Sequence, residues 1–326
     1  MFDELVEAGR IASRVRKGAV KKVHAGMRVF DLVEWVESEI RSAGAGLAFP
    51  CNVSINDIAS HYTSSVVDDT LLCEGDLVKI DLGSHVNGFV SDSAVSVVVE
   101  GNNVDCVDVD GNPLFMPGRL DEGNPVVGED VLVERELLVE STEAALENAL
   151  SILCDGVSVG DIGRVVEDTI SSYGFKSVVN LSGHSIGRFK LHGGVSIPNC
   201  RVDDSVCLNE GDCVAIEPYA TCGIGHVIDV PLYNIFSYLR NRPFRSAESS
   251  LLLRRVREDF TYFPFASRHL FDGSMGLDEF NVAFEPLVSS RAVFPYPVCR
   301  EQSGCVVAQS EHTVIVEKDS CFVTTL

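Results

Sequence analysis

Lysine is scarce in this chain, and positive charge of any kind is in short supply. Lysine and arginine together number 26 against 48 aspartates and glutamates, which gives a formal net charge of −22, and only seven of the basic residues are lysine. So acidic a surface argues against binding to nucleic acid or to anionic lipid. Dense carboxylates are typical of proteins in a salty cytoplasm, where charges are strongly screened, and an ordinary acidic protein is the alternative.

Long apolar runs are missing as well. No stretch approaches the roughly 20 apolar residues that a membrane span needs, and residues 1–20 carry charges at helical spacing instead of the apolar centre of a signal peptide. The eleven cysteines occur without the paired spacing of a metal finger, which favours buried free thiols in a reducing compartment. We therefore expect a cytoplasmic protein that does not enter a membrane.

The chain contains an internal repeat. Residues 26–44 recur in part at 156–174, at an offset of 130, and residues 74–81 recur in part at 210–217, at an offset of 136. In each half the first segment has the apolar spacing of an amphipathic helix, and the second alternates like a strand that ends on Asp81 or Glu217. Two related halves are implied, and a pseudo-twofold axis brings these two carboxylates toward each other.

Two stretches interrupt this duplicated plan. Residues 101–130 are rich in Asp, Gly, Asn and Pro, and we expect a surface excursion there; Pro117 stands where a calcium-binding EF-hand needs glutamate. Residues 233–290 hold two amphipathic stretches, Glu248–Phe260, which contains arginine, and Leu277–Val288, and these predict a helical insertion. The length of 326 residues suits one layered core with insertions, so we expect a single catalytic domain over residues 1–326, of the α+β class.

Five side chains that bind metals well stand in short, chemically dense strings. They are Asp81 in Lys-Ile-Asp-Leu-Gly, Asp92 in Val-Ser-Asp-Ser-Ala, His184 in Ser-Gly-His-Ser-Ile-Gly, Glu217 in Ala-Ile-Glu-Pro and Glu311 in Gln-Ser-Glu-His-Thr. Four carboxylates and one imidazole suit a pair of divalent ions, and the imidazole favours manganese, iron, cobalt or zinc over calcium or magnesium. Any one of the five alone is more often a surface carboxylate or a structural histidine, so the hypothesis depends on the whole set.

A turn connects the first two of these carboxylates. Asn87-Gly88 lies between Asp81 and Asp92 and is a strong signal for a β-hairpin. Folded back at this turn, the hairpin places the two carboxylates on neighbouring strands and on one face.

With these residues the chain resembles the type 2 methionine aminopeptidases, in the archaeal form that lacks a long lysine-rich N-terminal extension. The similarity runs from about residue 4 to residue 325 and includes the strings Leu47-Ala-Phe-Pro50, His61-Tyr-Thr63, Leu181-Ser-Gly-His184, Leu191-His-Gly-Gly194, Phe263-Pro-Phe-Ala266 and Glu311-His-Thr-Val-Ile-Val-Glu-Lys-Asp319. Ser91 and Ser93 beside Asp92, Gly194 in place of a common alanine, and the long excursion depart from the family pattern. None of these departures removes a metal ligand.

The resemblance implies a pita-bread fold with pseudo-twofold duplicated halves and a helical insertion. It also implies that Asp81, Asp92, His184, Glu217 and Glu311 hold two divalent metal ions (cobalt, manganese, iron or zinc), with Asp92 and Glu311 bridging them. Glu217 is the expected general base, His192 is expected to donate a hydrogen bond to the scissile carbonyl, and His61 is expected to contact the substrate and to be the nucleophile that fumagillin-like epoxides trap. Phe49 and Leu191 are expected to wall an apolar pocket for methionine, although Phe49 is equally compatible with ordinary core.

These residues predict a cytosolic enzyme that removes the initiator methionine from nascent polypeptides whose second residue is small. We expect it to act near the ribosome, to be a monomer and to make no direct contact with nucleic acid. Two alternatives remain open. One is an X-Pro aminopeptidase or prolidase-like peptidase, which shares this kind of ligand set, and the other is a pita-bread protein that binds a partner without catalysis.

Overall fold

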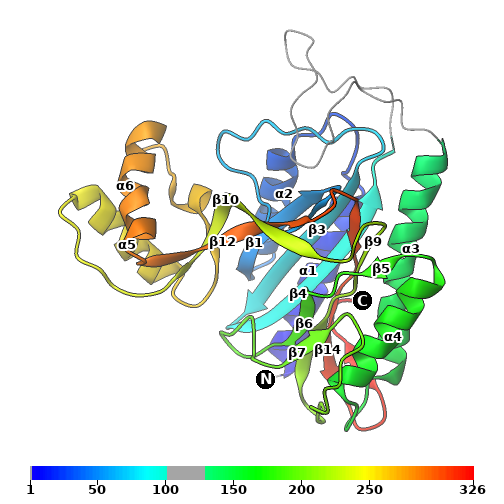
Figure 1. Cartoon of the computed structure of the whole chain (residues 1–326). Helices are drawn as coiled ribbons and strands as arrows, with labels where there is room; N and C mark the ends of the chain where they lie inside the picture. Colours follow the sequence, from blue (N-terminus) through cyan, green and yellow to red (C-terminus); the bar gives the residue numbers. More distant parts are fainter. Residues whose placement is uncertain (1, 101–128) are drawn as a thin grey trace.

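The computed structural model describes residues 2–100 and 129–326 (Figure 1). The excursion expected at residues 101–130 lies outside these ranges apart from its last two residues. In the first half of the chain, helices α1 (Phe2–Val20) and α2 (Val29–Ser42) pack on an antiparallel sheet of β1 (Gly46–Ile55), β3 (Leu77–Val86) and β4 (Phe89–Val98), with the short β2 (Ile58–Ser60) after β1. The apolar stripe of α1 faces the sheet and forms its main core with α2.

The second half repeats this plan. Helices α3 (Glu129–Ile152) and α4 (Val159–Ser172) pack on a sheet with the order β15-β14-β8-β6-β7, built from β15 (Cys321–Val323), β14 (His312–Val316), β8 (Cys213–Ile216), β6 (Ser182–Ser185) and β7 (Ser196–Pro198). A small sheet of β5 (Lys176–Ser177), β9 (Tyr219–Thr221) and β13 (Val307–Gln309) lies beside it. Within the described residues, no helix is both long and apolar enough to cross a membrane.

The internal repeat corresponds to equivalent elements. Helices α2 and α4 begin and end at positions 130 residues apart, and β3 and β8 begin 136 residues apart. Each helix is followed by a glycine in the left-handed region, Gly44 at φ 83° and Gly174 at φ 87°, a conformation that glycine adopts without steric cost and that ends helices. The two expected helix and strand pairs are therefore present in the order that the sequence predicts.

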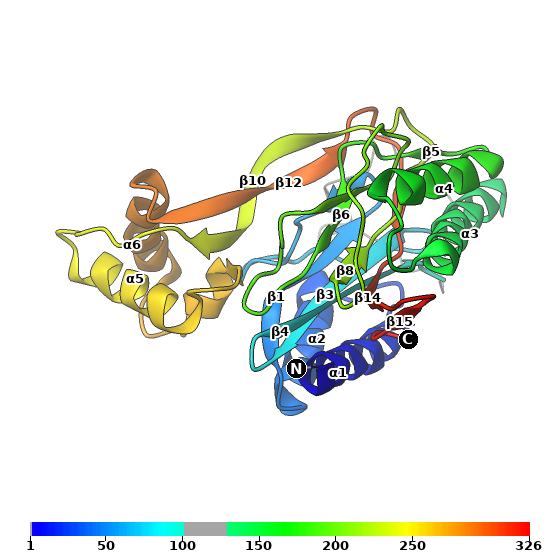
Figure 2. The ribbon, with the colours of Figure 1, turned by 90° about the horizontal axis from the view of Figure 1, so that it is seen from below.

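Two long antiparallel strands, β10 (Val227–Tyr238) and β12 (Val293–Glu301), extend away from the two halves and carry a separate group of helices (Figures 1 and 2). Between them lie α5 (Ala247–Asp259), β11 (Phe265–Ala266), the 3₁₀ helix η1 (Ser267–Leu270) and α6 (Leu277–Ser289). These elements have their own apolar core around Phe265, Phe284 and Leu252. The helices coincide with the two amphipathic stretches predicted between residues 233 and 290.

A buried carboxylate attaches this group of helices to the first half. Glu37 of α2 is fully buried and accepts hydrogen bonds from Arg268, from His269 at 2.8 Å and from the backbone N–H of Cys51 at 3.1 Å. Burial alone raises the pKa of Glu37, but the hydrogen bond and charge of His269, together with Arg268 and Arg41, outweigh it and lower the pKa to about 2. Glu37 is thus ionised and fully paired in the folded protein.

The cysteines differ from expectation at one position. Nine of them within the described residues carry free thiols, as the absence of paired spacing predicts. Cys73 is disulfide-bonded, so the expectation of free thiols is wrong there. Spacing along the chain cannot predict such a bond because it depends on which segments fold side by side.

Candidate active site

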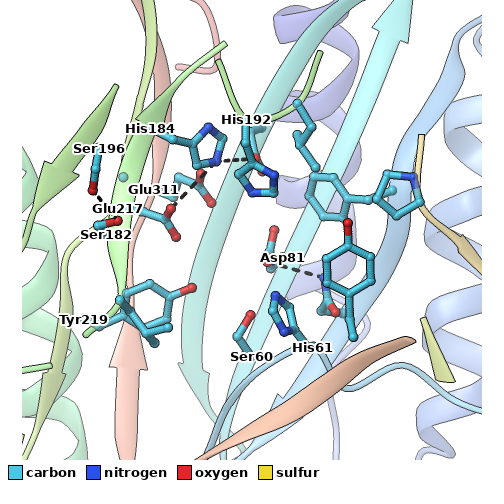
Figure 3. A pocket seen from close by; sticks show the side chains of 18 of the residues that line it. Ser60, His61, Asp81, Ser182, His184, His192, Ser196, Glu217, Tyr219 and Glu311 are labelled. Atoms are coloured by element: carbon cyan, nitrogen blue, oxygen red, sulfur yellow. Dashed lines mark hydrogen bonds and ion pairs between the residues drawn. The ribbon is translucent and has the colours of Figure 1, made fainter. Parts of the chain in front are cut away.

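A cavity of about 380 Å³ lies between the two halves, and every site residue predicted from the sequence lines it (Figure 3). The five candidate metal ligands are on its floor, and Phe49, His61, Leu191 and His192 surround them. The structure therefore brings together residues that lie up to 262 positions apart in the sequence, from Phe49 to Glu311.

The β3–β4 hairpin supplies the first two carboxylates. Asn87 and Gly88 both have positive φ, 51° and 85°, which is the geometry of a type I′ turn and confirms the predicted hairpin. Asp92 pairs with Gly83 across the ladder, two residues from Asp81, and because side chains alternate along a strand both carboxylates face the cavity. The hydroxyl of Thr313 accepts the N–H of Asp92 and donates to its carbonyl, both at 2.7 Å, and so joins β4 to β14.

The second half supplies the other three ligands from the ends of its strands. His184 lies on β6, Glu217 directly follows β8, and Glu311 directly precedes β14. The Nε2 atom of His184 lies 3.6 Å from Asp92 Oδ2 and 3.8 Å from Glu217 Oε1. One ligand atom each from Asp92, His184 and Glu311 lie within 4.8 Å of one another, and these three residues are buried. This grouping is compact enough for a single ion to contact all three.

Without a cation, the carboxylates of this floor repel one another. Burial, followed by the charges of neighbouring carboxylates, raises the pKa of Asp81 and of Glu311 well above the ordinary values. Burial also raises the pKa of Glu217 to about 8. One oxygen each of Asp81 and Asp92 is buried and has no hydrogen-bond partner in the described part of the chain. Buried oxygen atoms with unused lone pairs and crowded negative charge are what divalent cations satisfy, so the donor set fits metal binding.

The two histidines beside the floor have opposite protonation preferences. Burial lowers the pKa of His184, but the hydrogen bond to Asp92 and the charges of Glu217 and Asp92 outweigh it and raise the pKa to about 9. The ring of His192 meets that of His184 edge-on, with centroids 4.4 Å apart. Desolvation in the cavity and the charge of His184 lower the pKa of His192 to about 4. His192 is therefore a neutral imidazole at pH 7, able to donate one N–H.

His61 faces the cavity from the other side, as Figure 3 shows. Its backbone is left-handed, with φ 64°, which is uncommon for a residue other than glycine and often marks a functional position. Its Nδ1 lies 3.0 Å from the carbonyl oxygen of Pro297, so Nδ1 carries the proton and Nε2 keeps its lone pair. Burial lowers the pKa of His61, which favours this neutral form.

The apolar wall combines predicted residues with others that the sequence analysis missed. Phe49 and Leu191 line the cavity with Ile235 of β10, Tyr296 of β12 and Pro264. A Cβ atom on Gly83 would lie 2.2 Å from the Phe49 ring, so glycine at that position leaves room for the ring. Pro264 lies in a string that was recognised, Phe263-Pro-Phe-Ala266, whereas Ile235 and Tyr296 have no local signal because only the β10–β12 pairing brings them here.

Tyr219 is a further residue of the cavity that the sequence analysis missed. It lies two residues after Glu217 and acts to lower the pKa of that carboxyl group, and Figure 3 shows its hydroxyl directed into the cavity. The Ala-Ile-Glu-Pro string ends at the residue before Tyr219. Alternation along the strand would nevertheless have indicated that Tyr219 faces the same way as Glu217.

The ligand motifs and their geometry can be compared with known families. Residues 3–318 match the family described as Metallopeptidase family M24. The chain belongs to metallopeptidase family M24. Within this family it is 42% identical over 325 residues to a methionine aminopeptidase of Methanothermobacter thermautotrophicus, which covers 100% of this chain and 99% of the relative. It is 43% identical over 324 residues to a methionine aminopeptidase of Pyrococcus horikoshii, which covers 99% of each chain. The resemblance to methionine aminopeptidases is confirmed.

Solved structures place the chain in the M24 fold. A methionine aminopeptidase from Rickettsia prowazekii superposes with a TM-score of 0.67 at 19% identity, over 100% of this chain and 96% of that one. A thermophilic Arx1 gives 0.78 at 16% identity, over 99% of this chain and 89% of that one. A prolidase from Pyrococcus furiosus gives 0.58 at 17% identity, over 100% of this chain but 63% of the prolidase. At these identities the likeness concerns the fold alone, and it confirms the α+β pita-bread fold.

Proposed function

We propose that this M24 protein is a methionyl aminopeptidase of type 2 that removes the initiator methionine from proteins whose second residue is small. The observation that carries the proposal is the convergence of the five motif residues on one cavity with an apolar wall. Full-length relatives named methionine aminopeptidase support it. The activity depends on divalent metal, in keeping with the family.

In this proposal Asp81, Asp92, His184, Glu217 and Glu311 would hold two divalent ions. The two unpartnered carboxylate oxygens and the compact Asp92, His184 and Glu311 group support this assignment. Manganese, iron, cobalt and zinc all suit a set of four carboxylates and one imidazole. When bound, such ions lower the pKa of a water molecule and polarise the carbonyl of the peptide bond.

The side chains of the chain itself move the protons and stabilise the developing charge. Glu217 accepts the proton of the attacking water and delivers it to the leaving nitrogen, and Tyr219 lines the cavity with it. His192, neutral because its pKa is lowered to about 4, donates its N–H to the carbonyl oxygen as negative charge develops there. His61 contacts the bound substrate through its free Nε2.

Specificity follows from the apolar end of the cavity. Phe49 and Leu191, with Ile235, Pro264 and Tyr296, surround a space in which a flexible thioether is held mainly by burial. A side chain of this size contributes about 1.5–3 kcal/mol when it is removed from water. The floor of carboxylates limits the room for the next residue, so small second residues are favoured.

A peptide panel tests the proposal against its main alternative. Met-Ala, Met-Pro, Met-Lys and Ala-Pro peptides, each supplied to protein reloaded with one divalent metal, should be cleaved in the order Met-Ala and Met-Pro first, with Met-Lys far slower. Rapid Ala-Pro cleavage would move the assignment to the X-Pro peptidases. Equal rates for Met-Ala and Met-Lys would contradict the size limit at the second position.

Removal of metal tests the enzymatic proposal against a non-catalytic pita-bread protein. Exhaustive chelation should abolish cleavage of Met-Ala, and addition of manganese or cobalt should restore it, because the proposed ions are what lower the pKa of the attacking water. Glu311→Ala should lose both bound metal and rate. Full turnover by metal-free protein would contradict the proposal, and so would the absence of turnover with every metal.

We also propose a domain organisation for the chain and a place in the cell where it acts. We assign residues 1–326 to a single catalytic domain and residues 233–290 to a helical insertion subdomain. The substrate is the N-terminus of nascent polypeptides, and we place the enzyme in the cytoplasm near the ribosome, as a monomer without direct contact with nucleic acid. The acidic composition supports the last point.

A further inference from the structure

A buried arginine from the first helix lies directly behind the carboxylate floor. Arg16 of α1 is only 8% exposed, although arginine is rarely buried without partners. Its guanidinium donates hydrogen bonds to the hydroxyl of Ser93, to the carbonyl oxygen of Glu311 at 3.3 Å and to the carbonyl oxygen of Thr325 at 2.9 Å. Its Nη1 also lies 3.2 Å from Nδ1 of His312. These partners come from three different segments of the chain.

Two of the partners adjoin Asp92 and Glu311, which are two of the proposed metal ligands. Ser93 follows Asp92 on β4, and Arg16 binds the main chain of Glu311 itself. The Ser93 hydroxyl also donates to the carbonyl oxygen of Glu311 at 3.3 Å. Arg16 and Ser93 therefore connect the backbones that carry Asp92 and Glu311, and they fix the separation of β4 and β14 at the site.

The C-terminal tail closes the same network. The hydroxyl of Thr325 lies 2.7 Å from Nδ1 of His312 and accepts the N–H of Thr313 at 3.2 Å. Thr313 is the residue whose hydroxyl holds both backbone groups of Asp92. A continuous set of hydrogen bonds thus runs from α1 through the tail to both strands.

Charge gives this arrangement a second effect. The positive charge of Arg16 lies against the main chain of Glu311, directly behind the carboxylate floor. A guanidinium does not lose its proton in proteins, so it offsets part of the negative charge of the floor whether or not metal is bound. A lysine would keep the charge but could not form the same fork of hydrogen bonds.

We propose that Arg16 is a positioning residue of the metal centre, which fixes Asp92 and Glu311 at the spacing required for two ions. This inference rests on the proposed ligand set. Residues that hold metal ligands in place commonly change metal affinity by about 10- to 100-fold when they are replaced. A purely structural role for Arg16 would instead lower stability and leave metal binding to the folded protein unchanged.

The test compares Mn²⁺ binding to metal-free full-length protein by titration calorimetry, with thermal unfolding as a parallel measurement. Arg16→Met keeps the length and apolar stem of the side chain, and it should weaken Mn²⁺ binding by about 10- to 100-fold. Arg16→Lys should recover part of that affinity because it restores the charge. Arg14→Met, on the exposed side of the same helix, is the matched control and should bind Mn²⁺ like the wild type.

If folded Arg16→Met binds Mn²⁺ with the affinity of the wild type, the inference is overturned and the role of Arg16 is purely structural. If Arg16→Met does not fold, Arg16→Lys and Thr325→Val decide the matter: weaker Mn²⁺ binding in both supports the network, and unchanged binding in both overturns it. Wild-type protein that takes up no Mn²⁺ would overturn this inference together with the proposed function. Wild-type protein that takes up Mn²⁺ but cleaves no Met-Ala peptide would overturn the proposed function alone.

Discussion

At the scale of single residues, His61 and His192 face one cavity, but replacing each of them should impair a different property of the protein. His192→Ala should raise the activation free energy by about 2–4 kcal/mol because it removes a donor to the developing oxyanion. This corresponds to a kcat that is lower by roughly 30- to 1000-fold. The variant should still be labelled by a fumagillin-like epoxide. His61→Ala should lose that labelling while its bound metal remains, because the free Nε2 fixed by Pro297 is the expected nucleophile.

Intact mass after epoxide treatment, with metal content measured on the same samples, checks this pair of expectations. An adduct that persists in His61→Ala, or that maps to another residue, would show that the nucleophile lies elsewhere. The wild-type protein and His192→Ala serve as positive controls in the same experiment.

The site residues that the sequence predicted are those with a dense local string around them. Asp81, Asp92 and His184 each stand among glycines and serines that mark a strand end or a turn. Arg16 has no such string, because it is one of several arginines at helical spacing on α1, and only the packing of α1 on β4 makes it different. A residue whose role depends on contacts with distant parts of the sequence cannot be recognised from the residues next to it.

At the scale of elements, the attachment of the helical insertion to α2 depends on Glu37. Glu37→Gln removes the charge that compensates buried Arg268, and a buried pair broken on one side usually costs about 3–5 kcal/mol of unfolding free energy. Glu34→Gln is the matched control: Glu34 pairs with the same Arg268 at 3.1 Å, but its side chain is 46% exposed, so its loss should cost less than about 1 kcal/mol. Urea unfolding at pH 7 measures both.

The effect of Glu37 should also depend on pH. Its pKa is about 2 in the folded protein against a reference value of 4.5, so the carboxylate contributes stability above pH 4.5 that is lost as the pH falls toward 2. Wild-type protein should therefore lose its advantage over Glu37→Gln as the pH is lowered through this range. A difference in stability that stays constant from pH 7 to pH 3 would contradict the assigned pairing.

Most elements were predictable because their patterns are strong. The helices of the repeat and the β3–β4 hairpin follow from apolar spacing and from glycine at their ends, and both helices of the insertion follow from apolar spacing. The contribution of β10 and β12 to the cavity wall was not predictable, because strand order and register decide which of their side chains reach it. The attachment through Glu37 was hidden for the same reason, since Glu37 looks like an ordinary charge on an amphipathic helix.

At the scale of the whole molecule, bound metal should stabilise the protein more at pH 8 than at pH 6. Without metal, the raised pKa of Glu217, about 8, means that stability present below about pH 4.5 is lost as the pH rises toward 8. A metal ion must displace the protons that remain on the carboxylates. These protons are easier to remove at higher pH, so the metal binds more tightly there. Free metal at 100 times its dissociation constant adds about 2.7 kcal/mol to the free energy of unfolding.

Thermal unfolding of metal-free and Mn²⁺-loaded protein at pH 6 and pH 8 measures this effect. Glu217→Gln lacks the titrating group, so the midpoint of its metal-free form should fall less between the two pH values. A metal-dependent increase in midpoint that is no larger at pH 8 than at pH 6 would count against the crowded carboxylate floor.

The net charge of −22 predicts a response to salt. If the surface is adapted to a salty cytoplasm, the melting temperature should rise from dilute buffer to molar potassium chloride, because salt screens the repulsion between carboxylates. A melting temperature that does not change over this range would leave the ordinary acidic protein as the explanation.

The contacts of Arg16 also have a consequence for the order in which the molecule is made. Arg16 meets Glu311 and Thr325 across 295 and 309 positions of the sequence, and chains grow at about 5–20 residues per second. On that scale α1 leaves the ribosome roughly 15 to 60 seconds before its last partners exist. Contacts this remote also form slowly, because a long loop must be closed first. Chains that stall before Glu311 therefore contain α1 and the first two carboxylates but no complete site, and the enzyme becomes active only after the segment from Glu311 to Thr325 has been made.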